Sequence, residues 1–561
     1  MIDAGIVVAI SAFAAFGSGS QRWSGFNSPD SEFYASLALF GDEVTDRAIE
    51  PAYQWTRLGY IAPVRLLVST MDPMIGFAVW RVILILIVVG ALYSIVRLVS
   101  TRQLATLAAI LAALNSVVLS FVSNTYLTGT IIAATALLIA LGAWGVLGAP
   151  RWPWLPALLS GAVAGWLVML NPYALMLGLS MWIGLRAVGL ATEPRARWRT
   201  LGRDTLLAVL GFAVVVGGFL ASGLAIFPGR DWLRTYLDWN SRLDYASFIG
   251  DRDVWHRDIA LLLPVAAILM ALVAVLIVRR SRAAIAAIVI SVTNVAFTAV
   301  YFALVPGPWL EAPTYVAKLW PGALIAIALA LAAVVGTRRL GWLGWILGAA
   351  IVPVVIWAGR WDSTVSITMG IVIGLVMVAA FASTAMLASR TGTRVFAVSV
   401  VATLAITAIG AQVLQNGRGQ LGTYGQFPFR AAYVDFDAEA LIRSKVAAEQ
   451  FVLDRTTPQD SIGIWTDPDR LLAAVAAMQM WGTYNNVSAG ATLVATEARA
   501  LDATRPTVIA MYAPTRTQID TFWDSLPPWS RPSDPDCTTV PYLGIGSPDA
   551  HVCITHLRWL D

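Results

Sequence analysis

The sequence predicts a polytopic α-helical membrane protein that carries a small α/β domain at its C-terminal end. Of the 561 residues, 58% are hydrophobic and only 13% are charged, whereas soluble globular proteins carry about 25% charged residues. Apolar runs of roughly 20 residues, each long enough to cross a bilayer, recur through the first three-quarters of the chain. Acids, prolines and polar residues return after about residue 415. We therefore expect a transmembrane domain over 1–414 and an α/β domain over 415–561.

About thirteen apolar segments are expected to span the membrane. Asn171 and Pro172 separate the fifth from the sixth, and this pair marks either a turn between two helices or a kink within one. The predicted spans are 2–16, 73–98, 104–122, 127–147, 154–170, 172–188, 206–227, 259–278, 284–304, 316–335, 340–358, 365–387 and 395–414.

The distribution of arginine predicts which side each loop faces. With a cytoplasmic N-terminus, the inner loops are 97–103, 148–153, 186–203, 279–282, 338–339 and 390–394, and every one carries arginine, as the positive-inside rule requires. An odd number of spans then places the C-terminal domain outside the cytoplasm. Arginine strongly outnumbers lysine, which suggests a bacterium with a GC-rich genome. We expect a multi-pass protein of the inner (plasma) membrane.

Short apolar segments in the C-terminal portion read as strands at 461–465, 507–511 and 552–555, with helices at 438–453 and 470–481. Alternating strands and helices are typical of an α/β domain. The only two cysteines, Cys537 and Cys553, both fall here. Their confinement to a segment predicted outside the cytoplasm favours a disulfide, although two unpaired buried thiols remain the alternative.

The outer segment 18–72, which follows the first span, concentrates ionisable residues next to the membrane. Asp30 and Glu32 lie two residues apart where the chain leaves that span. Charged side chains close to hydrocarbon are costly, so they are retained mostly where they bind or react with something. The alternative is that Asp30 only caps an amphipathic helix over 31–40.

Basic and aromatic residues in three outer segments could hold an anionic, sugar-bearing ligand. An amphipathic stretch over 55–67 carries Arg57 and Arg65 at headgroup level, where a cation can hold a lipid phosphate or simply snorkel, an alternative that suits Arg65. Lys318 is expected about one turn inside a span and needs an anionic partner, either a lipid phosphate or Glu311. The segment 228–258 mixes aromatic, acidic and basic residues, which suit sugars but also an interfacial aromatic belt.

The whole arrangement resembles the glycosyltransferase-C superfamily, in particular bacterial relatives of protein O-mannosyltransferases and aminoarabinose transferases. The features that carry the resemblance are the many short-looped helices, the acidic Asp30-x-Glu32 pattern in the first outer segment, and the outer C-terminal domain. The segment from Pro313 to Pro321 is similar to the Arg-Tyr-Leu-Leu-Pro-type helix entrance of those families, with Lys318 in the basic role. Many relatives have adjacent acids where this chain has Ser31 between the two, which leaves open which carboxylate is the base.

The resemblance implies an enzyme that moves a sugar from a polyprenyl-phosphate donor to an extracytoplasmic glycan, lipid or protein. Asp30 would be the general base, and Glu32 would either bind the acceptor or help to hold a divalent cation. Apart from that cation, no cofactor, no dedicated metal-ligand cluster and no nucleic acid is expected. The donor phosphate would bind Arg57, Tyr315 and Lys318. Acceptor or sugar would bind Tyr34, Tyr60, Arg230, Trp232, Arg252 and His256.

Two other classes of protein compete with an enzyme. A transporter or flippase for a lipid-linked or polar solute should carry charged residues at mid-membrane depth and broken helices in matching halves, and the spans here are nearly free of charge. In a membrane-anchored binding or assembly protein, the C-terminal domain would do the work.

The predicted topology can be tested on the two cysteines. In intact cells treated first with a membrane-impermeant reductant, Cys537 and Cys553 should react with an impermeant thiol reagent, because the C-terminal domain is expected outside the cytoplasm. Labelling is read by mass spectrometry of the tryptic peptides. Thiols that react only after membrane lysis would show the opposite orientation.

Overall fold

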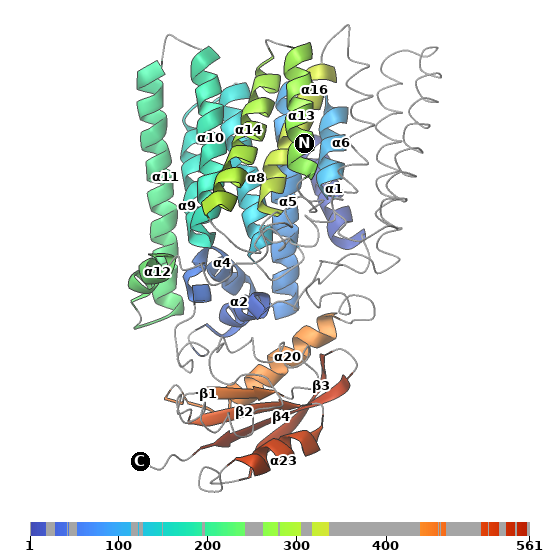
Figure 1. Ribbon diagram of the computed structural model, residues 1–561, viewed down its shortest axis with the longest axis vertical. Helices are drawn as coiled ribbons and strands as arrows, with labels where there is room; N and C mark the ends of the chain where they lie inside the picture. Colours follow the sequence, from blue (N-terminus) through green and yellow to red (C-terminus); the bar gives the residue numbers. More distant parts are fainter. Residues whose placement is uncertain are drawn as a thin grey trace, which may run out of the picture.

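Helices make up most of the part of the chain that the structure describes. In the computed structural model a helical bundle forms one end, a small β-sheet domain forms the other, and the short helices α2, α4 and α12 lie between them (Figure 1). The described residues are 2–17, 29–41, 43, 53–113, 122, 127–148, 150–192, 197–229, 231–241, 262–278, 281–304, 317–335, 438–457, 459–460, 462–466, 507–513, 515–526, 534–544 and 547–557.

Each predicted span up to residue 335 coincides with an observed helix. The helices of the bundle are α1 (Ile2–Ala12, continued by the π-helical turn η1, Phe13–Gly17), α5 (Pro73–Val99), α6 (Arg102–Ala113), α8 (Thr128–Leu147), α9 (Leu155–Leu170), α10 (Pro172–Thr192), α11 (Arg197–Ile226), α13 (Leu262–Ile277), α14 (Arg282–Leu304) and α16 (Trp320–Val335). Asn171 is extended, with φ −165° and ψ 118°, so a turn and not a kink separates α9 from α10. The predicted spans 340–358, 365–387 and 395–414, and the predicted boundary near 414, lie outside the described residues.

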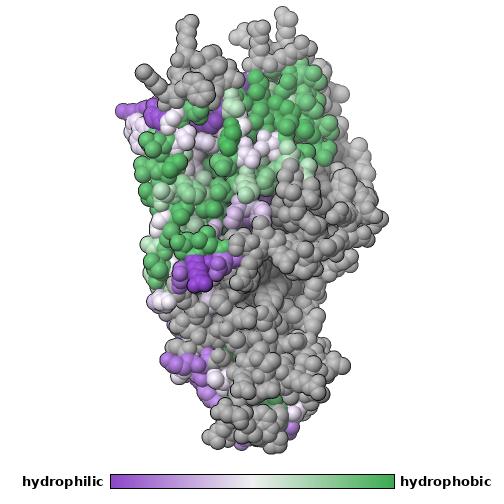
Figure 2. Space-filling model, turned by 60° about the vertical axis from the view of Figure 1, so that its left-hand side comes forward, coloured by the Kyte–Doolittle hydropathy of each residue, from purple (hydrophilic) through white to green (hydrophobic). Residues whose placement is uncertain are grey.

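The surface of the bundle suits a membrane. Within the described part of the chain, three helical segments are long and apolar enough to cross a bilayer, namely Pro73–Val99, Thr128–Leu147 and Thr200–Ile226. Helix α11 lies at the edge of the bundle (Figure 1) and exposes Leu206, Val209, Val214 and Leu224. Figure 2 shows a hydrophobic area over this part of the molecule, with hydrophilic side chains at both of its ends. A band of that kind is what lipid contact requires.

Glycine allows α9 and α11 to pack closely. A Cβ atom added to Gly161 would lie 1.8 Å from the backbone oxygen of Ala208, and one added to Gly211 would lie 2.1 Å from that of Leu158. Small residues at such crossings let two backbones approach and gain van der Waals contact, which is the main attraction between helices in lipid.

The layer beneath the bundle consists of α2 (Pro29–Phe40), the 3₁₀ turn η2 (Tyr53–Thr56), α4 (Leu58–Val68) and α12 (Trp232–Ser241). The indole Nε1 of Trp166 donates a hydrogen bond to the Gly59 carbonyl at 2.8 Å, and the Tyr236 hydroxyl donates to the Val168 carbonyl at 3.0 Å. Trp166 and Val168 both lie near the C-terminal end of α9. These contacts fix α4 and α12 to the bundle.

The C-terminal domain is a four-stranded sheet with one helix on each face. Its strand order is β1 (Ile462–Thr466), β2 (Val508–Ala513), β4 (Ser547–His556) and β3 (Asp536–Gly544); β1 and β2 are parallel, and the other two pairs are antiparallel. Helix α20 (Ala438–Leu453) packs against one face and α23 (Arg516–Ser525) against the other (Figure 1). Strand β2 alternates accordingly: Val508, Ala510 and Tyr512 face α20, while Ile509 and Met511 face α23.

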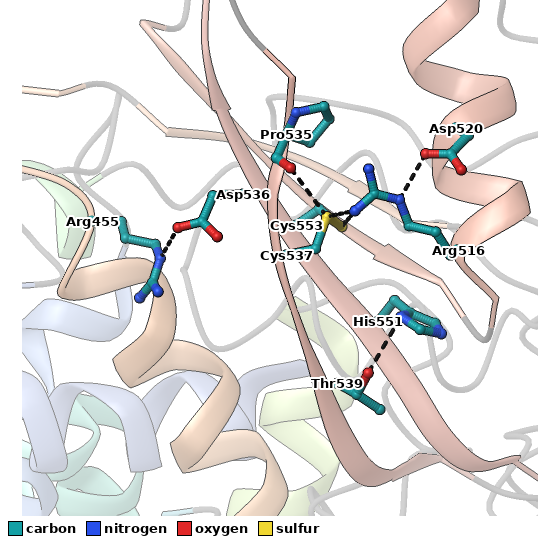
Figure 3. The surroundings of a disulfide bond; sticks show 9 residues. All are labelled: Arg455, Arg516, Asp520, Pro535, Asp536, Cys537, Thr539, His551 and Cys553. Atoms are coloured by element: carbon teal, nitrogen blue, oxygen red, sulfur yellow. Dashed lines mark hydrogen bonds and ion pairs between the residues drawn. A yellow bond between two sulfur atoms is a disulfide. The ribbon is translucent and has the colours of Figure 1, made fainter.

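The structure pairs Cys537 of β3 with Cys553 of β4 in a disulfide between directly opposite residues (Figure 3). The Arg516 guanidinium of α23 contacts both sulfur atoms and binds Asp520 at 2.7 Å. The predicted helix 438–453 and the three predicted strands are present, whereas the predicted helix 470–481 lies outside the described residues. Strand β3 and helix α23 were not predicted.

The close packing of α9 and α11 can be tested with a pair of glycine substitutions. Gly161→Ala forces its new methyl group against the Ala208 carbonyl, so the two helices must separate, at a cost of about 1–3 kcal/mol in the free energy of unfolding. Gly217→Ala is the control, because nothing lies within 4 Å of its added Cβ. Thermal unfolding in detergent should show a loss of stability in the first variant only. Equal stability of the two variants would contradict the observed crossing.

Candidate functional site

The predicted site residues that the structure describes gather in the layer between the bundle and the α/β domain. Tyr34 of α2 and Tyr60 of α4 are both buried and meet edge to face, with ring centroids 5.8 Å apart. The Arg65 guanidinium donates to the carbonyl oxygens of Ala38 and Leu39, the latter at 3.3 Å. Arg65 therefore stabilises the C-terminal end of α2, where a cation complements the helix dipole, and the expectation that it snorkels is replaced by this contact.

The two candidate catalytic carboxylates belong to the first turn of α2. The helix begins at Pro29, so Asp30 is its second residue and not a cap in front of a helix that starts at Ser31. Proline suits the first helical position, and carboxylates in a first turn are stabilised by the helix dipole. Asp30 and Glu32 are two residues apart in this helix, and positions two apart do not share a helix face. Their roles stay predictions.

Two buried or partly buried cations come together where α4 meets the bundle. Arg57 occupies the N-cap position of α4 and is 8% exposed. Lys318 lies partly buried in the 3₁₀ turn η8 (Ala317–Leu319). Burial and, to a smaller extent, the positive charge of Arg57 together lower the pKa of Lys318 to about 7. We call Arg57 and Lys318 the basic pair.

The turn that carries Lys318 is fixed by the bundle. Helix α16 begins only at Trp320, so Lys318 precedes the apolar helix and does not lie one turn inside it, as the sequence led us to expect. The Asn294 side-chain amide of α14 donates to the Leu319 carbonyl at 2.9 Å. Lys318 therefore lies at the entrance of the apolar helix α16, in a turn that α14 holds.

Tyr236 of α12 borders the basic pair. Burial raises the pKa of its hydroxyl, and the charge of Arg57 opposes that rise, which places the two side chains in electrostatic contact. Trp232, predicted to bind sugar, stacks on Tyr236 with centroids 5.2 Å apart and donates to the Trp55 carbonyl at 3.0 Å. Trp232 is thus part of the packing that holds α12 on η2, the aromatic-belt alternative; its sugar-binding role stays a prediction.

Several predicted positions fall outside the described residues. They are Arg230, Arg252, His256, Glu311 and Tyr315. Among the residues that are described, no three His, Cys, Asp or Glu side chains gather as a metal site would require.

Sequence reasoning missed three buried charged residues in the described part of the chain, namely Arg81, Asp204 and Glu449. Arg81 is buried inside α5, and its signal was visible, since a charged residue within a span is usually functional or structurally specific. Glu449 of α20 is also buried and accepts a hydrogen bond from Ser36 of α2 at 2.5 Å. The two residues are 413 positions apart in the sequence, so no local pattern could have paired them.

Searches of family models and of curated protein sequences return no match to this chain. Solved structures do match. The crystal structure of ArnT from Cupriavidus metallidurans bound to undecaprenyl phosphate superposes with a TM-score of 0.54 at 14% sequence identity, covering 98% of this chain and 97% of ArnT. The apo structure of the same protein gives a TM-score of 0.50 with the same identity and coverage.

A weaker likeness, on which nothing below depends, is to the archaeal oligosaccharyltransferase AglB from Archaeoglobus fulgidus in complex with an inhibitory peptide and a dolichol-phosphate. The TM-score is 0.48 at 12% identity, over 91% of this chain and 69% of AglB. The likeness to ArnT over nearly the whole chain confirms the predicted fold class: the chain has the glycosyltransferase-C fold.

The proximity of Arg57 and Lys318 can be tested through the reactivity of Lys318. The chain has a second lysine, Lys445 in α20, which serves as an internal reference. Amine modification of Lys318 should rise with a midpoint near pH 7, and Arg57→Gln should move the midpoint upward, because removing a neighbouring positive charge favours the protonated amine. The measurement is peptide mapping by mass spectrometry across a pH series. An unchanged midpoint in Arg57→Gln would show that the two charges are not neighbours.

Proposed function

We propose that this protein is a membrane glycosyltransferase that takes a sugar from a polyprenyl-phosphate donor and transfers it to an extracytoplasmic acceptor. The observation that carries the proposal is the basic pair, held at the end of a bundle with the glycosyltransferase-C fold and next to the helix α2 that bears Asp30 and Glu32. Two neighbouring cations form a place that is complementary to an anionic group such as a phosphate.

The position of the basic pair supports a donor of this lipid class. A phosphate on a long isoprenoid chain keeps its charge at the membrane surface while its tail stays in hydrocarbon. Arg57 precedes α4 and Lys318 precedes the apolar helix α16, so both would lie near such a phosphate. The matching ArnT structure is bound to undecaprenyl phosphate, which supports a lipid of this class. A bidentate guanidinium and a point-like ammonium are complementary phosphate ligands.

The chemistry requires a base, an electrophile and a stabilised leaving group. A carboxylate of α2 removes the proton of an acceptor hydroxyl as its oxygen attacks the anomeric carbon of the donor sugar. The bond from that carbon to the phosphate oxygen breaks, and the lipid phosphate leaves with increased negative charge. The basic pair stabilises that charge more strongly in the transition state than in the ground state, which is what accelerates a reaction. Asp30 is our choice for the base, with Glu32 orienting the acceptor or helping to hold a cation.

The proposal predicts that Asp30→Asn abolishes transfer without unfolding the protein. Asparagine keeps the shape of the side chain but cannot take a proton, so the rate of sugar transfer should fall by about 10²–10⁴-fold. The assay uses the purified full chain, a panel of polyprenyl-phosphate sugars, and product analysis by mass spectrometry. Melting temperature and binding of undecaprenyl phosphate, measured on the same preparation, should stay near those of the wild type.

Glu32→Gln is the second variant, which distinguishes between the two carboxylates of α2. Full transfer by Asp30→Asn together with loss of transfer by Glu32→Gln would move the role of base to Glu32. If both variants transfer sugar at the wild-type rate, the catalytic role of α2 is wrong. A wild-type protein that binds undecaprenyl phosphate tightly but transfers none of the sugars in the panel would favour the lipid-transport alternative.

A further inference from the structure

In the part of the chain that the structure describes, a buried hydrogen bond links the α/β domain to the candidate catalytic helix. The Ser36 hydroxyl of α2 donates to a carboxylate oxygen of Glu449 on α20 at 2.5 Å. Both residues are shielded from solvent, with 0% of Ser36 and 1% of Glu449 exposed. In Figure 1, α20 lies between α2 and the sheet, so this bond joins the membrane part of the chain to the C-terminal domain.

Glu449 occupies a position where an apolar residue would be expected. It shares a helix face with Val452, three residues further on, and its neighbour Ala448 is also buried in the apolar core. A buried carboxylate is costly unless it is hydrogen-bonded, and such groups are more useful for fixing one arrangement than for adding stability. Its retention among apolar neighbours points to a role in orientation.

Helix α2 is held on every side over its central part. Residues 34–38 are all fully buried. Tyr60 packs against Tyr34, Arg65 binds the carbonyl oxygens at the C-terminal end, and Glu449 binds the middle of the helix at Ser36. The first two contacts come from α4, whereas the third comes from the other domain. Asp30 precedes Ser36 by six residues, about 9 Å along the axis of the same helix. A rotation of α2 about that axis therefore moves the carboxylates of Asp30 and Glu32.

We propose that Glu449 is a positioning residue: by accepting the hydrogen bond of Ser36, it makes the α/β domain fix the orientation of α2 and of the carboxylates of Asp30 and Glu32. This inference rests on the proposed function for its catalytic consequence. It assigns to the C-terminal domain a part in the reaction without placing any of its residues in contact with substrate. A shift of about 1 Å in a catalytic group can cost 10²-fold in rate.

The test compares Glu449→Ala, Glu449→Gln and Ser36→Ala with a matched control, Thr456→Val. Thr456 is a buried hydroxyl just beyond the end of the same helix, and its hydrogen bond goes to the Val452 carbonyl within the C-terminal domain. Three quantities are measured on the full-length protein: the turnover number for sugar transfer, the dissociation constant for undecaprenyl phosphate, and the rate of amide hydrogen exchange in α2.

Glu449→Ala and Ser36→Ala should lower turnover by roughly 10- to 100-fold, leave the dissociation constant for undecaprenyl phosphate unchanged, and speed hydrogen exchange in α2. Glu449→Gln keeps an acceptor for the Ser36 hydroxyl and should retain most of the turnover. Thr456→Val should leave all three quantities at their wild-type values, whatever its effect on the melting temperature. A loss of lipid binding in parallel with turnover, or a Glu449→Gln variant as impaired as Glu449→Ala, would overturn the proposal.

The hydrogen-exchange measurement separates this inference from the proposed function. If the wild type transfers no sugar from any donor, the glycosyltransferase proposal fails, yet faster exchange of α2 in Glu449→Ala would still show that the domain holds the helix. If the wild type transfers sugar but Glu449→Ala leaves the hydrogen exchange of α2 unchanged, the positioning role is overturned and the proposed function stays intact.

Discussion

The close approach of α4 to the end of α9 determines the position of every element on that side of the bundle. A Cβ atom on Gly59 would lie 2.9 Å from the Leu170 side chain and 3.0 Å from the backbone of Met169, so only glycine allows this contact. The Trp166 indole then binds the Gly59 carbonyl. Arg57 precedes Gly59 by two residues, and Arg65 follows it in the same helix and binds α2. A larger residue at 59 would displace α4, and with it Arg57 of the basic pair and the contact of Arg65 with α2.

The basic pair illustrates how the protein handles charge where water is scarce. The pKa of the Lys318 ammonium is lowered by burial and by the charge of Arg57, whereas an arginine offers a planar guanidinium with a rigid fork of donors. The two cations are accordingly not interchangeable.

The sequence predicts the elements of the fold well and their long-range contacts poorly. Apolar length located most helices of the bundle up to residue 335 to within a few residues, because a bilayer imposes a minimum length on an apolar helix that crosses it, but α11 begins at Arg197 and not at 206. The start of α2 was misjudged because proline at a first helical position and aspartate at a cap give similar patterns. Helix α23 did carry a signal, the Thr515-x-x-Gln518 capping box that the structure forms. Strand β3 contains Pro541 and no long apolar run. The meetings of Arg57 with Lys318 and of Ser36 with Glu449 depend on tertiary packing, for which the sequence gives residue types but no distances.

The sheet of the C-terminal domain has a different neighbour on each face, and this has a consequence for how the molecule unfolds. The face that α20 covers belongs to the same continuous apolar core as the bundle, including residues of α2 and α4. The face that α23 covers forms a core of its own. Cooperative unfolding units follow such contiguous cores. Helix α23 and the core beneath it are expected to open alone. Helix α20 and the core beneath it are expected to open together with the membrane part. The boundary between the two unfolding units therefore runs along the sheet of the C-terminal domain.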